Sequence, residues 1–482
     1  MTKSVLAIDL GATSGRVIEG FVAPGSLRYE VIHRFSNGPV SKGNELHWNA
    51  SGLFAEALEG MAAVGRSASE VVSVGIDAWA VDYALLRQGQ ILWEPFHYRD
   101  ERNARAVAAV HGKRTHADLF RTNGLQFLSI NTLYQLSAEN WGGEAGTAEA
   151  FLLIPDLMAY WLTGQQVMEI TNASTTGLLD VSSGKLDAEL IAISGAPAGI
   201  FAPLVEAGVT VASFAPAVAK AVGFSSPVVT VGSHDTASAV VAAPLSGPSS
   251  AYISCGTWGL VGVEIGRPIL SDAARKANFT NERGVDGRIR FLTNVMGLWL
   301  LNESVSSWRE AGDTRTLESL VAQAGEYTGP RPVFDVSDPM FMAPGGMPER
   351  ISAWFRDRSE NAPTDPVGMM ACIIESLAVA FAHAVRMAGT LSSTDVTDIS
   401  LVGGGSLNAV LCQRLADRAG VPVVAGPVEA TALGNILVQA RAAGLVEGDL
   451  ESLRSLVRLS SNLVTYEPRS RSQRSRDGGW VE

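Results

Sequence analysis

The sequence predicts an α/β protein built from two lobes of similar size, with ligands held in a cleft between them. Two strand–turn–strand segments, residues 5–21 and 251–263, open the two halves of the chain and resemble each other in pattern. Short β-branched runs alternate with small, apolar helical segments, as expected for a sheet covered by helices. The stretch LSGPSS at 245–250 has the composition of a linker. We therefore expect an N-terminal lobe at 1–244 and a C-terminal lobe at 245–466. A charged, disordered tail is expected at 467–482.

The composition is that of a soluble globular protein with a large core. Hydrophobic residues make up 46% of the 482 residues, and charged residues 18%. The net charge of −12 argues against a nucleic-acid-binding surface, although backbone amides can still hold a phosphate ligand. We expect no membrane span and no signal peptide. The three cysteines, Cys255, Cys372 and Cys412, lack CxxC spacing, which excludes a zinc cluster and favours the reducing cytoplasm.

The first hairpin carries a glycine-rich turn, DLGATSGR, at residues 9–16. A P-loop or a dinucleotide fingerprint would open a helix, whereas this turn joins two strands. Its amides, the hydroxyls of Thr13 and Ser14, and the charge of Arg16 could all bind phosphate oxygens. Gly11 and Gly15 would let the backbone approach a ligand closely. A plain hairpin turn is the alternative.

The second polar stretch lies near the middle of the chain, after the β-branched run at residues 228–231. His234 and Asp235 follow this buried strand and open a small, apolar helix at 237–243. Ligands sit at such strand ends in open α/β sheets. Asp235 is therefore either a catalytic carboxylate or merely the N-cap of the helix, since Asp is a favoured cap.

A third polar stretch, IDAWAVDY at residues 76–83, ends another buried strand. Asp77 and Asp82 flank Trp79, and an aromatic ring beside carboxylates can hold a hydroxyl-rich ligand. The alternative is that Trp79 belongs to the core.

The remaining elements follow from hydrophobic periodicity and from breakers. Three glycines, 403–405, separate a strand at 399–402 from a helix and permit contact with a flat or phosphorylated ligand, with a bare tight turn as the alternative. The helical segment at 151–163 contains Pro155, which marks the true start of the helix near residue 154. Helices are predicted at 51–63, 125–136, 151–163 and 368–387.

Two lobes that each offer a hairpin to one phosphate chain have the architecture of actin-like (ribonuclease-H-like) ATPases. Within that architecture the chain resembles the FGGY carbohydrate kinases over residues 4–466. DLGATSGR and SCGTWGL resemble the two phosphate hairpins, SHDTASA the catalytic strand–helix junction, and LVGGGSLN the adenosine loop. Other segments are typical of the members that act on L-rhamnulose: HRFSNG, IDAWAVDY, YRDERN, NVMGLWLL and AGPVEATALGNI.

The resemblance implies ATP-dependent phosphorylation of a ketose, with ATP as co-substrate and Mg²⁺ as cofactor. Asp235 would be the general base, and Asp9 would orient Mg²⁺, through water because magnesium keeps part of its hydration shell. The sugar would be lined by Ala80, His234, Asp235, Thr236 and Asn294. The phosphates and nucleotide would be held by Ala12, Thr13, Ser14, Gly15, Arg16, Thr257, Asn302 and Gly404.

Three positions depart from the pattern of the family members that act on L-rhamnulose. Ala80 stands where glycine is usual, Asn302 where glutamine is expected, and Asn49 where many relatives have aspartate. The first two bear on contacts with the sugar and with the nucleotide.

The expected acceptor is L-rhamnulose, phosphorylated at O1, with L-fuculose or xylulose as alternatives. A non-kinase actin-like ATPase, such as a chaperone or a filament protein, is a remote alternative, because the nucleotide core consumes the chain to about residue 444 and leaves no room for a peptide-binding domain. The partners would be a small sugar and ATP, without nucleic acid or membrane, and the protein would be a monomer or homodimer.

Overall fold

The computed structural model describes residues 2–65 and 69–470 and forms two compact units that interleave along the chain. Among the described residues, unit 1 is drawn from Met1–Ala242, Glu264–Phe291 and Ala430–Ser460; unit 2 is drawn from Ala243–Val263, Leu292–Glu429 and Ser461–Glu482. The boundary predicted between residues 244 and 245 stays a prediction. Two segments that follow it in the chain, Glu264–Phe291 and Ala430–Ser460, belong to unit 1 because they pack there. Of the predicted tail, residues 471–482 lie outside the described residues, whereas Arg469 is paired with Asp417 at 2.6 Å.

Unit 1 is organised around a six-stranded sheet in the order β14-β15-β6-β1-β2-β3. The predicted first hairpin is present: β1 (Lys3–Leu10) and β2 (Ser14–Ala23) are antiparallel, and β1 runs parallel to β6 (Glu70–Ala78). The remaining strands of unit 1 are β3 (Ser26–Ser36), β4 (Val40–Lys42), β5 (Glu45–His47), β7 (Tyr83–Arg87), β8 (Gln90–Ile91), β9 (Ala150–Leu153), β10 (Met168–Glu169), β11 (Leu179–Asp180), β12 (Lys185–Leu186), β13 (Leu204–Val205), β14 (Thr210–Ser213), β15 (Pro227–Val229) and β18 (Thr280–Arg283).

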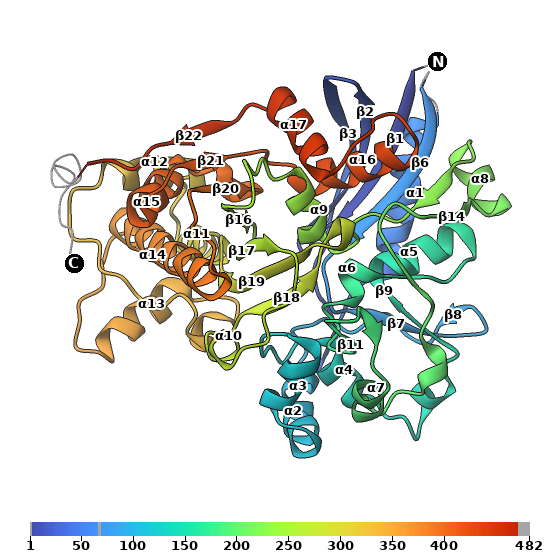
Figure 1. Cartoon of the computed structure of the whole chain (residues 1–482). Coiled ribbons are helices and arrows are strands. Elements are labelled where there is room, and N and C mark those ends of the chain that lie inside the picture. Colours follow the sequence, from blue (N-terminus) through green and yellow to red (C-terminus); the bar gives the residue numbers. More distant parts are fainter. Residues whose placement is uncertain (1, 66–68, 471–482) are drawn as a thin grey trace. The chain divides into compact units, whose positions relative to one another are not determined.

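Helices cover both faces of this sheet, because side chains alternate between the faces along each strand. On β2, Val17 faces Gly60 of α1, whereas Gly20 faces Ile436 of α16, which lies along β1 and β6 (Figure 1). The helices of unit 1 are α1 (Ala50–Val64), α2 (Arg102–Lys113), α3 (His116–Asn123), α4 (Thr132–Ser137), α5 (Ile154–Thr163), α6 (Ile170–Ala173), α7 (Ala188–Ser194), α8 (Pro216–Val222), α9 (Asp235–Ala242), α10 (Asp272–Lys276), α16 (Ala430–Ala442) and α17 (Leu450–Ser460), with short 3₁₀ helices η1 (Glu144–Thr147), η2 (Ala198–Ile200) and η3 (Val285–Gly287).

The sheet of unit 2 repeats the strand order of unit 1. It continues from β19 (Ile289–Met296), which runs out of unit 1, in the order β19-β17-β16-β20-β21-β22. As in unit 1, a hairpin (β16–β17) is followed by two parallel pairings and an antiparallel edge strand. The strands are β16 (Ser250–Cys255), β17 (Trp258–Ile265), β20 (Asp398–Val402), β21 (Val423–Ala425) and β22 (Val464–Tyr466). This match, together with the similar pattern of the two hairpins, supports an internal duplication of the chain.

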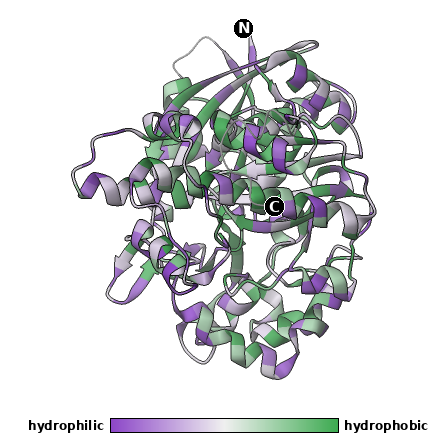
Figure 2. Ribbon diagram, turned by 90° about the vertical axis from the view of Figure 1, so that its left-hand side faces the viewer, coloured by the Kyte–Doolittle hydropathy of each residue, from purple (hydrophilic) through white to green (hydrophobic). Residues whose placement is uncertain are grey.

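The longest helix of unit 2, α14 (Pro366–Ser392), is long and apolar enough to cross a membrane, but 78% of its most apolar stretch is buried. Its Phe381 packs where a Cβ on Gly259 of β17 would stand, so α14 is a core helix. The helices mix hydrophobic and hydrophilic residues (Figure 2). The other helices of unit 2 are α11 (Trp299–Glu310), α12 (Leu317–Glu326), α13 (Met347–Arg356) and α15 (Ala409–Ala419), with η4 (Pro339–Phe341) and η5 (Gly404–Leu407).

Three of the four helices predicted by range are present as α1, α5 and α14, and α5 begins at Ile154, as the adjacent proline indicated. The helix predicted at 125–136 is wrong over its first half. The chain leaves α3 through Gly124 in the left-handed conformation and becomes helical again only at Thr132. Residues 125–131 instead use side-chain hydrogen bonds, such as the one from the amide of Leu125 to Asn123.

The contact between α9 and α16 has no room for a side chain at Gly434. A Cβ there would stand 1.8 Å from the carbonyl oxygen of Ser238, which is backbone and cannot swing away. We expect Gly434→Ala to lower the free energy of unfolding by about 3 kcal/mol, because the two helices must separate. Urea unfolding measures this. The control is Gly112→Ala in α2, which meets nothing within 4 Å and should be neutral or stabilising; equal stability of both variants would contradict the packing.

Candidate active site

Two adjacent parallel strands of unit 1 each carry an aspartate near their end, and the two carboxylates lie side by side. Asp9 at the end of β1 is in register with Asp77 on β6, and both are buried. Burial raises the pKa of both carboxyls; the charge of Asp9 raises the pKa of Asp77 further, whereas a hydrogen bond with Asp77 lowers the pKa of Asp9. Arg16, 3.5 Å from Asp9, and the amide of Asn435 oppose this rise. Asp235 raises the pKa of both groups further, so three acids share one region of unit 1.

Asp77 is hydrogen-bonded to Asn435 of α16, and Asn435 is in turn bonded to Gln439 of the same helix. The side chain of Asn435 donates to Asp77 Oδ2 at 2.5 Å, and Gln439 donates to Asn435 Oδ1 and to the carbonyl of Leu6. The hydroxyl of Ser73 donates to Gln439 Oε1. Sequence reasoning did not assign either amide. The available signal was the spacing of Asn435 and Gln439, four residues apart on one face of an apolar helix.

Asp235 is the first residue of α9, and its carboxylate does not cap that helix. The carbonyl of His234 accepts the first bonds from the amides of Ala237 and Ser238, so His234 occupies the cap position. Among the described residues, the bonded partner of Asp235 is the Thr236 hydroxyl, 3.0 Å from Oδ1, and His234 Nε2 lies 3.4 Å from the same oxygen. About a third of the Asp235 side chain is exposed, and no hydrogen bond from any of the described residues reaches Oδ2. The geometry therefore favours the catalytic interpretation over the cap.

The loop before Asp235 is anchored by a buried glutamate. Oε2 of Glu169 accepts hydrogen bonds from the amide and hydroxyl of Ser233 and from the amide and hydroxyl of Thr171. The Thr171 hydroxyl in turn lies 3.3 Å from the amide of His234. Burial raises the pKa of Glu169, and the bonds from Thr171 and Ser233 oppose that rise. The loop carrying His234 is thus fixed from the side of α6.

His234 is also fixed from the side of β19. Arg290, fully buried, approaches His234 Nδ1 at 3.0 Å and Glu282 Oε2 at 3.1 Å. Neither Arg290 nor Glu282 was assigned from the sequence, because nothing in their local pattern distinguishes them from an ordinary ion pair.

The first hairpin turn spans residues 11–13 and is clamped by Asn37, whose amide groups donate to the carbonyls of Gly11 and Thr13. The amide of Gly11 donates to Ser14 O at 2.9 Å, closing a tight turn. The structure gives Gly15 a different role from the predicted ligand approach: a Cβ there would stand 2.2 Å from the ring of Phe35. The predicted phosphate-binding residues Ala12 and Thr13 therefore lie in the turn, and Ser14, Gly15 and Arg16 begin β2, where Arg16 pairs with Asp9.

Trp79 and Asp82 belong to the core rather than to an open ligand pocket. Asp82 Oδ2 accepts hydrogen bonds from the indoles of Trp48 and Trp79, at 2.5 and 3.0 Å, and from the amide of Tyr98. Gln135 donates to the other oxygen at 2.8 Å. Burial raises the pKa of Asp82 to about 7, although all four donors oppose the rise.

The predicted sugar-contacting Ala80 sits in a strained turn between these residues. The amide of Asp82 donates to Ala80 O at 2.9 Å, which closes a γ-turn around Val81 at φ 69°. A β-branched residue rarely adopts this conformation. Thr132 holds the strained peptide through a 2.6 Å bond to Val81 O. The backbone at Ala80 is thus positioned precisely beside the end of β6.

In unit 2 the second hairpin turn, Gly256-Thr257, contacts the start of α11. The amides of Gly297 and Trp299 donate to the carbonyl of Thr257, and Leu298 donates to that of Gly256. Asn302 lies exposed one turn into α11, and Asn294 lies on β19. Thr257 and Asn302 are therefore at the same end of the unit 2 sheet.

The glycine loop after β20 contacts the same hairpin. A Cβ on Gly405 would stand 2.4 Å from the Cys255 sulfur, and Gly403, at φ 82°, packs on the Cys255 carbonyl. Gly404 between them is exposed, with only Leu298 within reach of its Cβ position. Gly403 and Gly405 are thus needed for close packing in a tight turn, as the alternative interpretation predicted. Of the three glycines, only Gly404 is open to a ligand.

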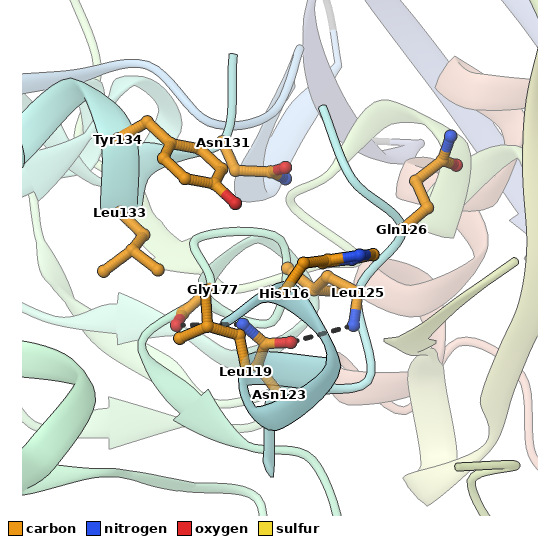
Figure 3. A pocket seen from close by; sticks show the side chains of 9 residues that line it. All are labelled: His116, Leu119, Asn123, Leu125, Gln126, Asn131, Leu133, Tyr134 and Gly177. Carbon is orange, nitrogen blue, oxygen red and sulfur yellow. Dashed lines mark hydrogen bonds between the residues drawn. The ribbon is translucent and has the colours of Figure 1, made fainter. Parts of the chain in front are cut away.

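A small pocket in unit 1 involves none of the predicted site residues (Figure 3). Asn123 closes one side, with bonds to Gly177 O and from the amide of Leu125. Its lining is His116, Leu119, Asn123, Leu125, Gln126, Asn131, Leu133, Tyr134 and Gly177.

Comparison with known proteins identifies the family over most of the chain. The model of the FGGY family of carbohydrate kinases, N-terminal domain, matches residues 4–242, and its C-terminal domain matches residues 251–443. The chain belongs to the FGGY family of carbohydrate kinases. This FGGY kinase therefore uses ATP to phosphorylate a sugar, as the resemblance implied.

Curated relatives of this FGGY kinase match it over nearly their full length. Proteins named rhamnulokinase are 35% identical in Bacteroides thetaiotaomicron (97% of this chain, 96% of that one), 38% in Pectobacterium atrosepticum (98% and 94%) and 37% in Bacillus subtilis (96% and 95%).

Solved structures confirm the two-domain fold. Glycerol kinase from Plasmodium falciparum with ADP has a TM-score of 0.78, at 14% identity over 98% of this chain and 96% of that one. Gluconate kinase from Lactobacillus acidophilus has a TM-score of 0.77, at 14% identity over 97% and 94%. These similarities show the fold alone.

Proposed function

We propose that this FGGY kinase is a cytoplasmic rhamnulokinase of L-rhamnose catabolism: it transfers the γ-phosphoryl group of ATP to O1 of L-rhamnulose, giving L-rhamnulose 1-phosphate and ADP. The observation that carries the proposal is the full-length similarity to proteins named rhamnulokinase. The three buried, unpaired cysteines are compatible with a reducing compartment.

In the proposed reaction Asp235 is the general base. Its free Oδ2 takes the proton from the O1 hydroxyl as O1 forms a bond to the γ-phosphorus and the bond to the bridging oxygen of ADP breaks. Oδ1 is already engaged by Thr236, so the carboxylate is held in one orientation. His234, Thr236, Asn294 and the backbone at Ala80 contact the sugar in this proposal.

The phosphates and nucleotide are assigned to backbone-rich turns. The turn from Ala12 to Arg16 and the hydroxyl of Thr257 bind phosphate oxygens, with Arg16 adding charge. Gly404 and Asn302 contact the nucleotide. Exposure of Gly404 between two packed glycines supports this assignment.

The residues around Asp9 fit a magnesium ion. Burial raises the pKa of Asp9 and of Asp77, the charge of Asp235 raises both further, and Asp77 Oδ1 is buried without a hydrogen-bond partner in the described part of the chain. A divalent cation with oxygen ligands would relieve this repulsion. Asp9 would hold Mg²⁺, directly or through water, and the ion would neutralise charge on the phosphates when bound.

A sugar panel tests the acceptor. We expect kcat/KM with Mg·ATP to be highest for L-rhamnulose among L-rhamnulose, L-fuculose, L-xylulose, D-xylulose and glycerol. A buried partner left unpaired by a misplaced hydroxyl costs about 1–3 kcal/mol, which is about 5- to 150-fold in kcat/KM. The Ala80 methyl group would reduce the ratio of kcat/KM between L-rhamnulose and the other sugars by shifting the sugar in the site. Ala80→Gly should then increase that ratio.

Coupled ADP release gives the rates, with sugar omitted as the blank. If another ketose exceeded L-rhamnulose by tenfold, the acceptor would be wrong and the kinase assignment would stand.

A further inference from the structure

Arg290 is a fully buried cation in contact with the proposed sugar-side histidine. Its Nη2 lies 3.0 Å from His234 Nδ1 and 3.1 Å from Glu282 Oε2, and its Nε donates to the carbonyl of Arg283 at 3.1 Å. All of these residues belong to unit 1. A buried guanidinium needs a counter-charge, which Glu282 supplies, but it does not need a histidine.

The chemistry of the contact fixes the protons on the imidazole. A guanidinium can only donate and stays charged at any accessible pH. His234 Nδ1 must therefore accept, which places the ring proton on Nε2. Nε2 faces the carboxylate of Asp235, 3.4 Å from Oδ1.

Glu282 offers the one competing arrangement among the described residues. Its Oε2 lies 3.4 Å from His234 Nδ1, so an Nδ1–H could point to it instead. At 3.4 Å, both Glu282 and Asp235 lie beyond a good N–H···O hydrogen bond to the ring, whereas the Arg290 contact at 3.0 Å is within range, so the Arg290 contact sets the tautomer. Burial opposes ionisation of Glu282, but the charge of Arg290, followed by the hydrogen bond and charge of His234, lowers the pKa of Glu282 on balance. Glu282 thus serves Arg290 as its counter-ion.

We infer that Arg290 is a positioning residue, which holds His234 in the Nε2–H tautomer so that the ring donates toward Asp235 Oδ1 and leaves Oδ2 free for the acceptor hydroxyl. The inference rests on the proposed function for the role of Asp235, but the tautomer itself does not. Thr236 donates to the same Oδ1. The Thr236 bond fixes the rotation of the carboxylate, and the Nε2–H of His234, 3.4 Å from the same oxygen, adds electrostatic attraction there.

The tautomer is measurable in the wild-type protein without any variant that could misfold. Imidazole ¹⁵N shifts, recorded at about pH 8 where unperturbed histidine is neutral, separate protonated from unprotonated ring nitrogens. His234→Gln assigns its signals among the seven histidines. We expect an unprotonated Nδ1 and a protonated Nε2. The opposite tautomer, an equal mixture or a doubly protonated ring would overturn the inference.

Variants test the catalytic consequence. Arg290→Met removes the donor and should abolish the tautomer preference and lower kcat by about 10²-fold, the effect of a misplacement of about 1 Å, with KM for ATP unchanged. Arg290→Lys keeps a donor and should restore part of both. Glu282→Asp, the matched control, keeps the counter-charge of Arg290 and should keep the tautomer.

The outcomes separate this inference from the proposed function. A wild-type protein that shows the Nε2–H tautomer but phosphorylates no ketose would contradict the function and not the tautomer. An active rhamnulokinase in which Arg290→Lys has wild-type kcat and a changed tautomer would refute the positioning role. If Arg290→Met does not fold, the wild-type spectrum and Arg290→Lys decide.

Discussion

Replacing Asp235 with asparagine is expected to lower kcat by about 10²–10⁴-fold, the usual contribution of a general base. The carboxamide is nearly the same size and can still accept from Thr236 through one oxygen, but its other end cannot take a proton. Stability and the KM for ATP should change little, because the side chain is partly exposed and His234, rather than Asp235, caps α9. Steady-state kinetics on the folded variant, checked by thermal unfolding, measure the effect.

A true helix cap provides the control. Asp187 accepts from the amide of Leu190 at the start of α7, and asparagine caps as well as aspartate does. Asp187→Asn should therefore leave both stability and kcat unchanged. If Asp235→Asn kept more than about a tenth of wild-type turnover, Asp235 would not be the base.

Asp82 is expected to make the protein less stable as the pH rises. Burial raises the pKa of Asp82 in the folded state to about 7, from 3.8. A folded state that binds the proton more tightly loses stability between the two pKa values, because ionising Asp82 in the core costs more than ionising it in the unfolded chain. Three pKa units correspond to about 4 kcal/mol, lost between about pH 4 and pH 7 and constant above.

Asp82→Asn isolates this contribution, because an amide does not titrate. The free energy of urea unfolding, measured from pH 5 to pH 8, should fall more steeply with pH for the wild type than for the variant. Asp272→Asn removes an acid whose side chain is 75% exposed and should retain the wild-type slope. Parallel slopes for Asp82→Asn and the wild type would show that the four donors hold Asp82 ionised throughout.

The local sequence pattern was sufficient to predict those elements whose residues lie within about twenty positions of one another in the chain. Both hairpins, the helices at α1 and α5, and the junction of a strand with α9 follow from alternation and turn residues, and the structure contains all of them. The helix predicted at 125–136, wrong over its first half, shows the limit: the apolar residues there lie in a partly buried loop, which accepts backbone hydrogen bonds on side chains such as Asn123. Periodicity reports burial and cannot report where the hydrogen bonds go.

The sequence by itself determined the fold class, the family motifs and the candidate base, because strands, turns and the residues beside them are adjacent in the chain. The tertiary structure alone decided what surrounds those residues. Asn435 reaches Asp77 across more than 350 positions, and Arg290 reaches His234 from a different strand. Such contacts depend on which elements pack together, since a buried polar group takes its partner from whichever neighbour the fold supplies. Local pattern does not encode that choice.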